Sequence, residues 1–228
     1  MTATLLLVHG AWHGSWCWGP LRDALGGDVD VRTVDLPSVG DDPAALGDLA
    51  ADAATVRAAL DGLDGPVVVL GHSYGGAVVT EAVTAGSGVA HLVYLCAFQL
   101  DAGDSLLGAV GGQEPPWWED VQGTAVRAAT PEQVFYNGVS PELTRDAVSR
   151  LGLQSRASLE QPLTDAAWRA VPSTYVVCEQ DQAIPVPAQE AMSSRAGDVL
   201  RLPAGHSPFL SHPAELAALL RPVLDRAG

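Results

Sequence analysis

The sequence predicts an α/β protein built on a mostly parallel, doubly wound sheet that carries one inserted segment. Three observations favour this fold class. Short apolar runs, bounded by Gly, Pro or Asp, recur along the chain. Segments with helical spacing lie between them, and this alternation fails once, between about residues 99 and 168. Because the runs are short and rich in Val and Leu, they suit strands buried on both faces of a parallel sheet.

The expected strands cover residues 4–8, 29–34, 67–70, 91–97, 174–178 and 199–202. The expected helices cover residues 46–60, 76–85 and 213–225. Pro213 suits the start of the last helix, where a missing N–H costs little. Regular alternation of strand and helix is typical of a doubly wound sheet, and a chain of 228 residues can form one large domain of this kind.

The segment 99–168 has a different character from the rest of the chain. It holds clusters of Pro and Gly, a pair of tryptophans and broken helical pieces. A segment of this length is too long for an ordinary loop, so it is expected to carry structure of its own. We therefore expect residues 1–98 and 169–228 to form the core, and residues 99–168 to form a cap over the carboxyl edge of the sheet.

Charge and cysteine content exclude several classes of protein. The formal net charge is −15, which is the wrong sign for a partner with a phosphate backbone. Three cysteines make an odd number, and Cys96 and Cys178 lie in apolar runs, so reduced, buried thiols are expected rather than disulfides. No apolar run approaches the ~20 residues of a membrane span, and the first ten residues lack a basic region, so a cytoplasmic protein without a membrane partner is expected.

The first candidate for a reactive residue is Ser73, in the sequence GHSYG at residues 71–75. This is the pattern G-x-S-x-G, with an expected strand before it and an expected helix after it, which is the context of a nucleophile elbow. Gly71 and Gly75 lack the Cβ atoms that would clash at so sharp a turn. A plain tight turn is the alternative, and a dinucleotide site fits poorly because G-x-G-x-x-G is absent.

A serine nucleophile needs a base. Where the serine stands on a nucleophile elbow, the known chain order is serine, then acid, then histidine, so the base is expected after Ser73. Three histidines follow Ser73. His91 opens an expected strand and comes too early, and His212 stands at a helix start before Pro213. His206 lies in a loop directly after the last expected strand, so it is the predicted base.

The acid should stand at the end of the strand before that base. The run 174–178 ends there, and Asp181 is preferred because a short side chain on a tight turn places its carboxylate well. Glu179 is the rival within the same stretch, and Asp101 is a weaker substitute.

The loop after the first strand predicts the remaining parts of the site. The backbone N–H of Ala11, together with that of Tyr74, is the expected pair of oxyanion donors. His9 and His13 stand four residues apart, but the Glu of H-E-x-x-H is missing, so no metal is expected. Aromatic residues that could line a substrate pocket, or simply pack in the core, are Trp12, Trp117, Trp118, Phe135 and Tyr136.

With these residues placed, the chain resembles the α/β-hydrolase superfamily over essentially its whole length. More narrowly, it resembles the branch of esterases and hydroxynitrile lyases that includes plant methylesterases, in pieces such as VLGHSYGGAVV and CEQDQAIPVPAQ. The resemblance implies a triad of Ser73, Asp181 and His206, and no cofactor. The lyases of this branch carry a lysine after the histidine and a threonine in the first loop, whereas Ser207 and Gly10 stand here. A lyase needs the positive charge of that lysine near the leaving cyanide, so its absence favours ester hydrolysis.

The expected function is that of a carboxylesterase acting on a small apolar or aromatic ester through an acyl-enzyme on Ser73. Hydrolysis of an amide or a carbon–carbon bond by the same groups stays open. So do two other classes of function: a cofactor-free dioxygenase or carbon–carbon bond enzyme that uses the His–Asp pair as base, and a ligand-binding receptor on the same fold. A homodimer is a further expectation.

Overall fold

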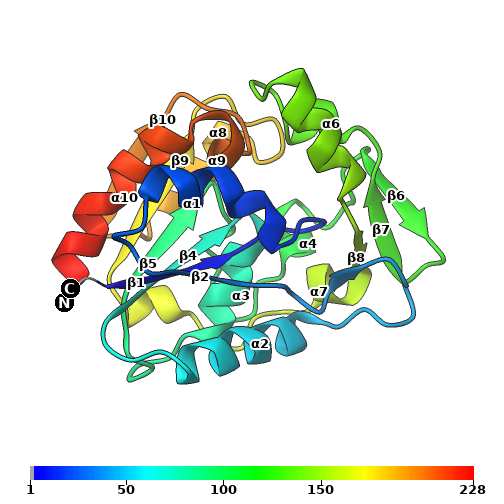
Figure 1. Ribbon diagram of the computed structural model, residues 1–228. Coiled ribbons are helices and arrows are strands. Elements are labelled where there is room, and N and C mark those ends of the chain that lie inside the picture. The colour runs from blue at the N-terminus through cyan, green and yellow to red at the C-terminus, as the bar shows by residue number, and fades with distance from the viewer. Residues whose placement is uncertain (1–2) are drawn as a thin grey trace.

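A six-stranded parallel sheet forms the centre of the computed structural model, which describes residues 3–228 (Figure 1). Its strands run in the order β10-β9-β5-β4-β1-β2, and every pairing is parallel. Their bounds are β1 (Thr4–Val8), β2 (Val31–Val34), β4 (Val67–His72), β5 (Val89–Leu95), β9 (Ser173–Cys178) and β10 (Asp198–Leu202). The predicted doubly wound sheet is confirmed, with strand ends that differ from the prediction by one or two residues.

Helices cover both faces of this sheet. On one face α1 (Gly19–Leu25) packs against α10 (Pro213–Ala227), and on the other α2 (Leu49–Asp61) packs against α3 (Tyr74–Ala82) (Figure 1). The predicted helix at 76–85 begins two residues earlier than expected, directly after Ser73. The short helix η1 (Ser15–Trp18) precedes α1, α8 (Val186–Ser193) packs beside β9, and α9 (Pro208–Ser211) precedes α10.

The winding direction changes between β1 and β4. From β1 the chain passes through α1 to β2 on one side, and from β4 it passes through α3 to β5 on the other. The loops that follow β1 and β4 therefore leave the sheet toward opposite faces. In open α/β sheets, a crevice opens at this point, outside the carboxyl ends of the strands.

The strands next to this point are buried along their whole length, which explains their continuous apolar sequences. In β1 the run TLLLV is buried at every position, and so is all of β4. The three cysteines of the chain are free and buried, as expected. None of the helices within residues 3–228 combines the length and the apolar character needed to cross a membrane.

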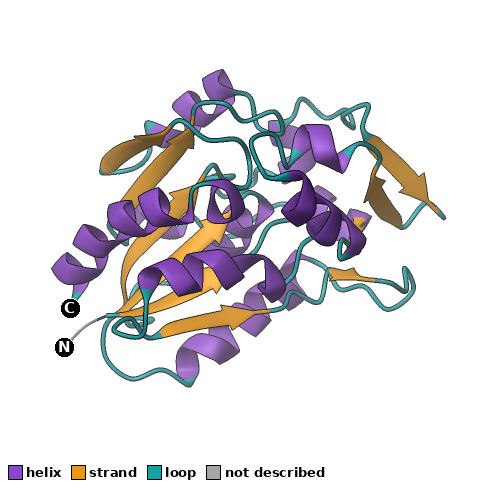
Figure 2. Cartoon of the chain, turned by 45° about the horizontal axis from the view of Figure 1, so that its top comes forward, coloured by secondary structure: helices purple, strands orange, loops and turns teal. Residues whose placement is uncertain are grey.

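Between β5 and β9 the chain forms a set of small elements. They are α4 (Leu106–Ala109), β6 (Trp118–Val121), β7 (Ala125–Ala128), α5 (Pro131–Val134), α6 (Pro141–Ser149), β8 (Leu153–Ser155), α7 (Arg156–Glu160) and η2 (Ala167–Arg169). Strands β6, β7 and β8 pair antiparallel in a second sheet, which stands apart from the large one in Figure 2. Its fourth strand, β3 (Val39–Gly40), comes from outside residues 99–168. No sequence pattern predicted that contribution.

Candidate active site

Ser73 stands at the sharp turn between β4 and α3. Its backbone has φ +53° and ψ −122°, a conformation that L residues rarely adopt. Its carbonyl oxygen accepts the N–H groups of Gly76 and Phe98, both at 3.0 Å, and its own N–H donates to the carbonyl of Leu95 at 3.3 Å. The neighbouring strand and helix thus hold the turn in its strained form, and the side chain lines a chamber at the carboxyl edge of the sheet.

Glycine is required at several points of this turn. A Cβ on Gly71 would lie 2.5 Å from the carbonyl oxygen of Gly75. A Cβ on Gly75 would lie 2.6 Å from the carbonyl oxygen of Val8, and one on Gly10 would lie 2.9 Å from the Cβ of Ser73. Atoms cannot approach so closely, so these glycines let the loop after β1 pack directly against the serine.

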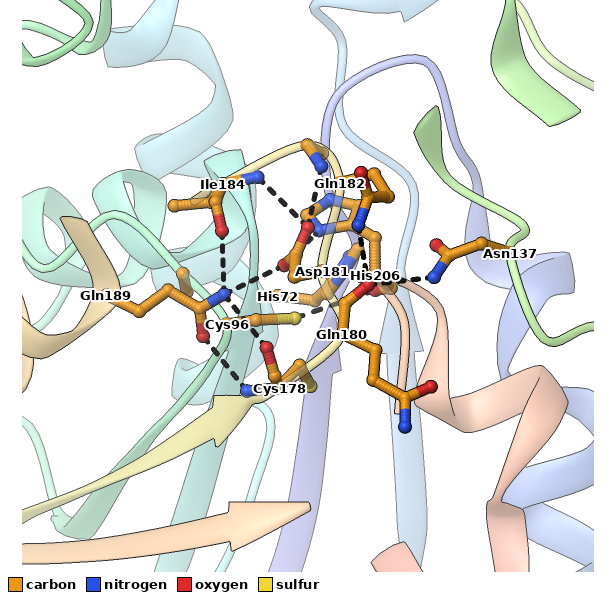
Figure 3. Close-up of polar contacts among 12 residues, drawn as sticks. His72, Cys96, Asn137, Cys178, Gln180, Asp181, Gln182, Ile184, Gln189 and His206 are labelled. Carbon is orange, nitrogen blue, oxygen red and sulfur yellow. Dashed lines mark hydrogen bonds and ion pairs between the residues drawn. The ribbon is translucent and has the colours of Figure 1, made fainter. Parts of the chain in front are cut away.

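Asp181 and His206 form a buried hydrogen-bonded pair beside the turn (Figure 3). The distance from His206 Nδ1 to Asp181 Oδ2 is 2.8 Å, and both side chains are at most 2% exposed. Because Nδ1–H donates to the carboxylate, Nε2 is left as the proton acceptor. His206 and Ser73 line the same chamber. Although the structure describes both side chains, it records no hydrogen bond between the serine hydroxyl and the imidazole.

The carboxylate of Asp181 is held by three further donors. Its Oδ1 accepts the N–H groups of Ala183 at 2.7 Å and Ile184 at 3.0 Å, while Oδ2 accepts Nε2 of Gln189 at 3.1 Å. The fully buried Gln189, on α8, also accepts the N–H of Cys178 and donates to the carbonyl of Ile184. Gln189, for which no sequence pattern gave a signal, therefore fixes the turn that carries Asp181.

The carbonyl oxygen of His206 is also held. His72 Nε2 donates to it at 2.8 Å, and the Cys96 thiol approaches it at 3.5 Å. His72, Cys96 and His206 bring possible metal-ligand atoms within 4.8 Å of one another. Burial raises the pKa of the Cys96 thiol well above its usual value, which disfavours the thiolate that a metal would need. The cluster thus fits an anchor for the His206 backbone better than a metal site.

The chamber at Ser73 is small and largely apolar. Its volume is about 30 Å³, and Ala11 and Tyr74 lie on its wall beside the serine. Neither of their backbone N–H groups has a hydrogen-bond partner among residues 3–228. Four of the five selected aromatic residues also line the chamber, namely Trp12, Trp117, Trp118 and Phe135.

Tyr136, the fifth selected aromatic residue, lies one layer behind the chamber. His13 Nδ1 donates to the carbonyl of Ala11 at 2.8 Å, so its Nε2 accepts the Tyr136 hydroxyl at 3.0 Å. Burial lowers the pKa of His13 to about 3, so the ring stays neutral at ordinary pH. His13 and Tyr136 thereby support the loop that carries Ala11.

A buried polar network connects the two loops of Ala11 and Tyr74. The N–H of Trp12 donates to Gln154 Oε1 at 3.1 Å, and Gln154 Nε2 donates to Ser38 Oγ at 2.9 Å. The N–H of Ser38 donates to Asp52 Oδ1 at 2.9 Å, and the Tyr74 hydroxyl donates to Oδ2 at 2.6 Å. Burial raises the pKa of Asp52 to about 6. No local motif predicted this network, which we name the Asp52 network.

The segment 99–168 also contacts the loops that carry Asp181 and His206. Asn137 Nδ2 donates to the carbonyl of Gln180, the residue before Asp181, at 2.8 Å (Figure 3). A Cβ on Gly205 would collide with the backbone oxygen of Asn137. Asn137 therefore packs against both loops at once.

The rival acids and bases lie in other surroundings. Glu179 is exposed and stands 3.7 Å from Arg201, while Asp101 binds Arg169. His91 Nε2 contacts the Thr174 hydroxyl at 2.9 Å, and His212 Nδ1 contacts the neighbouring Ser211 hydroxyl. None of these four side chains lines the chamber at Ser73.

Comparison with known proteins gives a consistent result. The model of the α/β hydrolase family matches residues 5–219. The chain is 34% identical over 171 residues to the α/β hydrolase nvfD of Aspergillus novofumigatus, a match that covers 68% of each protein. It is 30% identical over 237 residues to a carbendazim hydrolyzing esterase of Nocardioides sp., over 96% of this chain and 98% of that one. A methylesterase from Arabidopsis superposes with a TM-score of 0.83 at 23% identity, over 98% of this chain and 99% of the other, which confirms the fold.

Proposed function

The chain belongs to the α/β hydrolase family, and we propose that it is a carboxylesterase that forms an acyl-enzyme on Ser73. The observation that carries this proposal is the shared chamber. A serine on a strained turn and an imidazole paired to a buried carboxylate line the same small cavity. This combination of groups is the one that nucleophilic acyl transfer needs.

In the proposed mechanism, His206 Nε2 takes the proton of the Ser73 hydroxyl as its oxygen attacks the ester carbonyl carbon. The hydrogen bond from Nδ1 to Asp181 stabilises the imidazolium that forms. The imidazolium then gives the proton to the alkoxy oxygen, the C–O bond breaks and the alcohol leaves. Water attacks the acyl-enzyme in the same way, with His206 again as base, and releases the acid and the free serine.

We assign the oxyanion to the backbone N–H groups of Ala11 and Tyr74. Both residues line the chamber, and neither N–H has another partner within the described chain. Tyr74 is also the first residue of α3, so the helix dipole adds to the stabilisation of negative charge there. One such donor is typically worth about 2.7–4 kcal/mol in the transition state.

The proposed substrate is a neutral ester with apolar groups. The chamber wall is mostly aromatic and aliphatic, which favours such a group over a charged one. The carbendazim hydrolyzing esterase, which matches nearly the whole chain, is an esterase by its name. A homodimer and a cytoplasmic location stay predictions of the sequence.

The test compares wild type with Ser73→Ala on a small panel of methyl and aryl esters. Wild type is expected to turn over many times. The variant should lose at least about 10³-fold in kcat, because the covalent step is gone. Ser87→Ala, at a half-buried position in the loop after α3 and outside the chamber, is the matched control and should match wild type. A fluorophosphonate should label wild type once, at Ser73.

Other results would identify the alternative classes. If Ser73→Ala keeps activity while His206→Ala loses it, the His–Asp pair acts alone as a base, as in a cofactor-free dioxygenase or a carbon–carbon bond enzyme. If a ligand binds tightly and no ester turns over, the protein is a receptor. Either result would contradict the esterase proposal.

A further inference from the structure

A second, much larger cavity adjoins the chamber at Ser73. Its volume is about 720 Å³, against about 30 Å³ for the chamber. It lies between α8 and the segment that runs from α4 to Trp117. The two cavities share the following wall residues: Phe98, Val110, Pro115, Trp117, Ala183 and Ile184. We name the larger cavity the outer cavity.

The difference in volume sets a limit on each half of a substrate. The chamber offers about 30 Å³ against about 720 Å³ in the outer cavity, so a small group such as acetyl fits the chamber better than a phenyl ring does. The outer cavity has the size of a site for an ordinary small-molecule ligand. An ester that uses both cavities therefore has one very small half and one bulky half.

The position of the catalytic groups indicates which half is which. The leaving oxygen must receive its proton from His206, so the alcohol departs on the side of the imidazole. The outer cavity is lined by residues 182–185, which directly follow Asp181, the partner of His206. Ser73, His206 and the oxyanion candidates Ala11 and Tyr74 line only the chamber, so the reacting carbonyl belongs there. Gln182 and Pro185, on the loop after Asp181, line only the outer cavity, so the group on the side of the Asp181–His206 pair extends into it.

The outer cavity also has a definite chemical character. Much of its wall is apolar, with Leu100, Pro185 and Met192 among its residues. It contains one residue of each charge, Asp104 and Arg195. Arg195 already donates to the carbonyl of Gln99 and lies over the ring of Trp168. One positive and one negative side chain leave the wall without net charge, which favours a neutral ligand over an ionic one.

We propose that the outer cavity binds the alcohol half of the substrate, and that the natural substrate is a short-chain acyl ester of a bulky, neutral, apolar alcohol. This assignment rests on the esterase activity proposed above and adds the orientation of the substrate to it.

Two isomeric esters test the orientation. Benzyl acetate places its ring on the alcohol side, and methyl phenylacetate places the same ring on the acyl side. Benzyl acetate is expected to have the higher kcat/KM by at least about tenfold, because its acyl group fits the chamber. Equal rates, or a preference for methyl phenylacetate, would overturn the assignment.

A substitution in the outer cavity provides a second test. Ala188→Trp, on the exposed side of α8, should lower kcat/KM for benzyl acetate at least about tenfold and leave ethyl acetate nearly unchanged. Ala58→Trp, at an exposed position of α2, is the matched control and should alter neither ester. An equal loss on both esters in Ala188→Trp would contradict a role in binding the alcohol.

The two proposals fail in different ways. If wild type hydrolyses ethyl acetate and Ser73→Ala does not, the esterase proposal holds, and a reversed preference between the isomers refutes the orientation alone. If wild type hydrolyses none of these esters and no fluorophosphonate reacts at Ser73, both proposals are refuted together.

Discussion

Two buried carboxylates lie near Ser73, one bonded to Tyr74 and one to His206, and they are held in different ways. Asp181 accepts four donors, of which one is the imidazole of His206. Asp52 accepts the Tyr74 hydroxyl and the N–H of Ser38. Both residues are at most 5% exposed. Burial alone therefore does not distinguish them, whereas the number and kind of donors do.

The comparison shows how one protein can use a buried acid for two purposes. At Asp181, a histidine in contact can accept a proton and become the counter-ion, so the charge can take part in chemistry. At Asp52, every donor is neutral, and burial raises the pKa to about 6. We interpret the first carboxylate as part of the reaction and the second as a positioning group for the loops of Trp12 and Tyr74.

The largest effect is expected for Asp181→Asn. The amide cannot stabilise the imidazolium and favours the wrong tautomer of His206, so kcat should fall about 10⁴-fold. Steady-state hydrolysis of a good ester measures this loss. Glu179→Gln is the matched control, since that carboxylate is exposed and should be dispensable. If Glu179→Gln lost most of its kcat while Asp181→Asn stayed active, Glu179 rather than Asp181 would be the partner of His206.

The next largest effect is expected in the pH dependence of protein stability, through Asp52. Its pKa is about 6 in the folded protein, against about 3.9 in an unfolded chain. Between these two values Asp52 keeps its proton in the folded protein and loses it in the unfolded chain. The free energy of unfolding therefore falls as pH rises from about 4 to about 6, by about 3 kcal/mol from this group. In Asp52→Asn that contribution is absent. Urea unfolding of both proteins at the two ends of the interval measures it, and parallel pH profiles would contradict it.

A smaller loss is expected for Gln189→Leu. The substitution leaves the N–H of Cys178 and the carbonyl of Ile184 without a side-chain partner. The cost should be about 2 kcal/mol in unfolding free energy, or about 4–8 °C in Tm. Gln180→Leu, at an exposed position, should leave Tm nearly unchanged. If both variants melt together with wild type, the amide of Gln189 does not hold the acid turn.

The smallest effect is the coupling between Tyr74 and Asp52. Tyr74→Phe removes a hydrogen bond to a carboxylate, so it should cost more in wild type than in Asp52→Asn, by about 1 kcal/mol at a pH above 7. A double-mutant cycle of unfolding free energies gives this coupling. It should shrink near pH 5, where Asp52 is protonated, and a coupling independent of pH would contradict an ionised partner.

Sequence patterns predicted the parts of the site that depend on local structure. Ser73 follows from a turn motif between a strand and a helix. Asp181 and His206 were selected because they come just after the last two strands of a parallel sheet, and the structure pairs them. Their contact with the serine hydroxyl stays a prediction.

The supporting groups could not be found in this way, because their contacts join distant parts of the chain. Trp12 and Gln154 are separated by 142 residues, and His72 meets the carbonyl of His206 across 134. Asp52 did leave a signal. It is a carboxylate within an Ala-rich helix, on the same side as Leu49 and Val56, which are buried. A charge on the apolar side of a helix indicates a buried partner.

The short strand β3 has a consequence for any attempt to exchange substrate specificity between relatives. Val39 and Gly40 pair with Gln154 and Leu153, so the second sheet is closed by a piece of chain that precedes the insertion by some sixty residues. A chimera that grafts only residues 99–168 from another family member would break that pairing. It would also replace Gln154, which donates a hydrogen bond to Ser38, by whatever residue the other protein carries there. The segment that must be exchanged is therefore discontinuous in sequence, and a chimera should replace residues 38–40 together with residues 99–168.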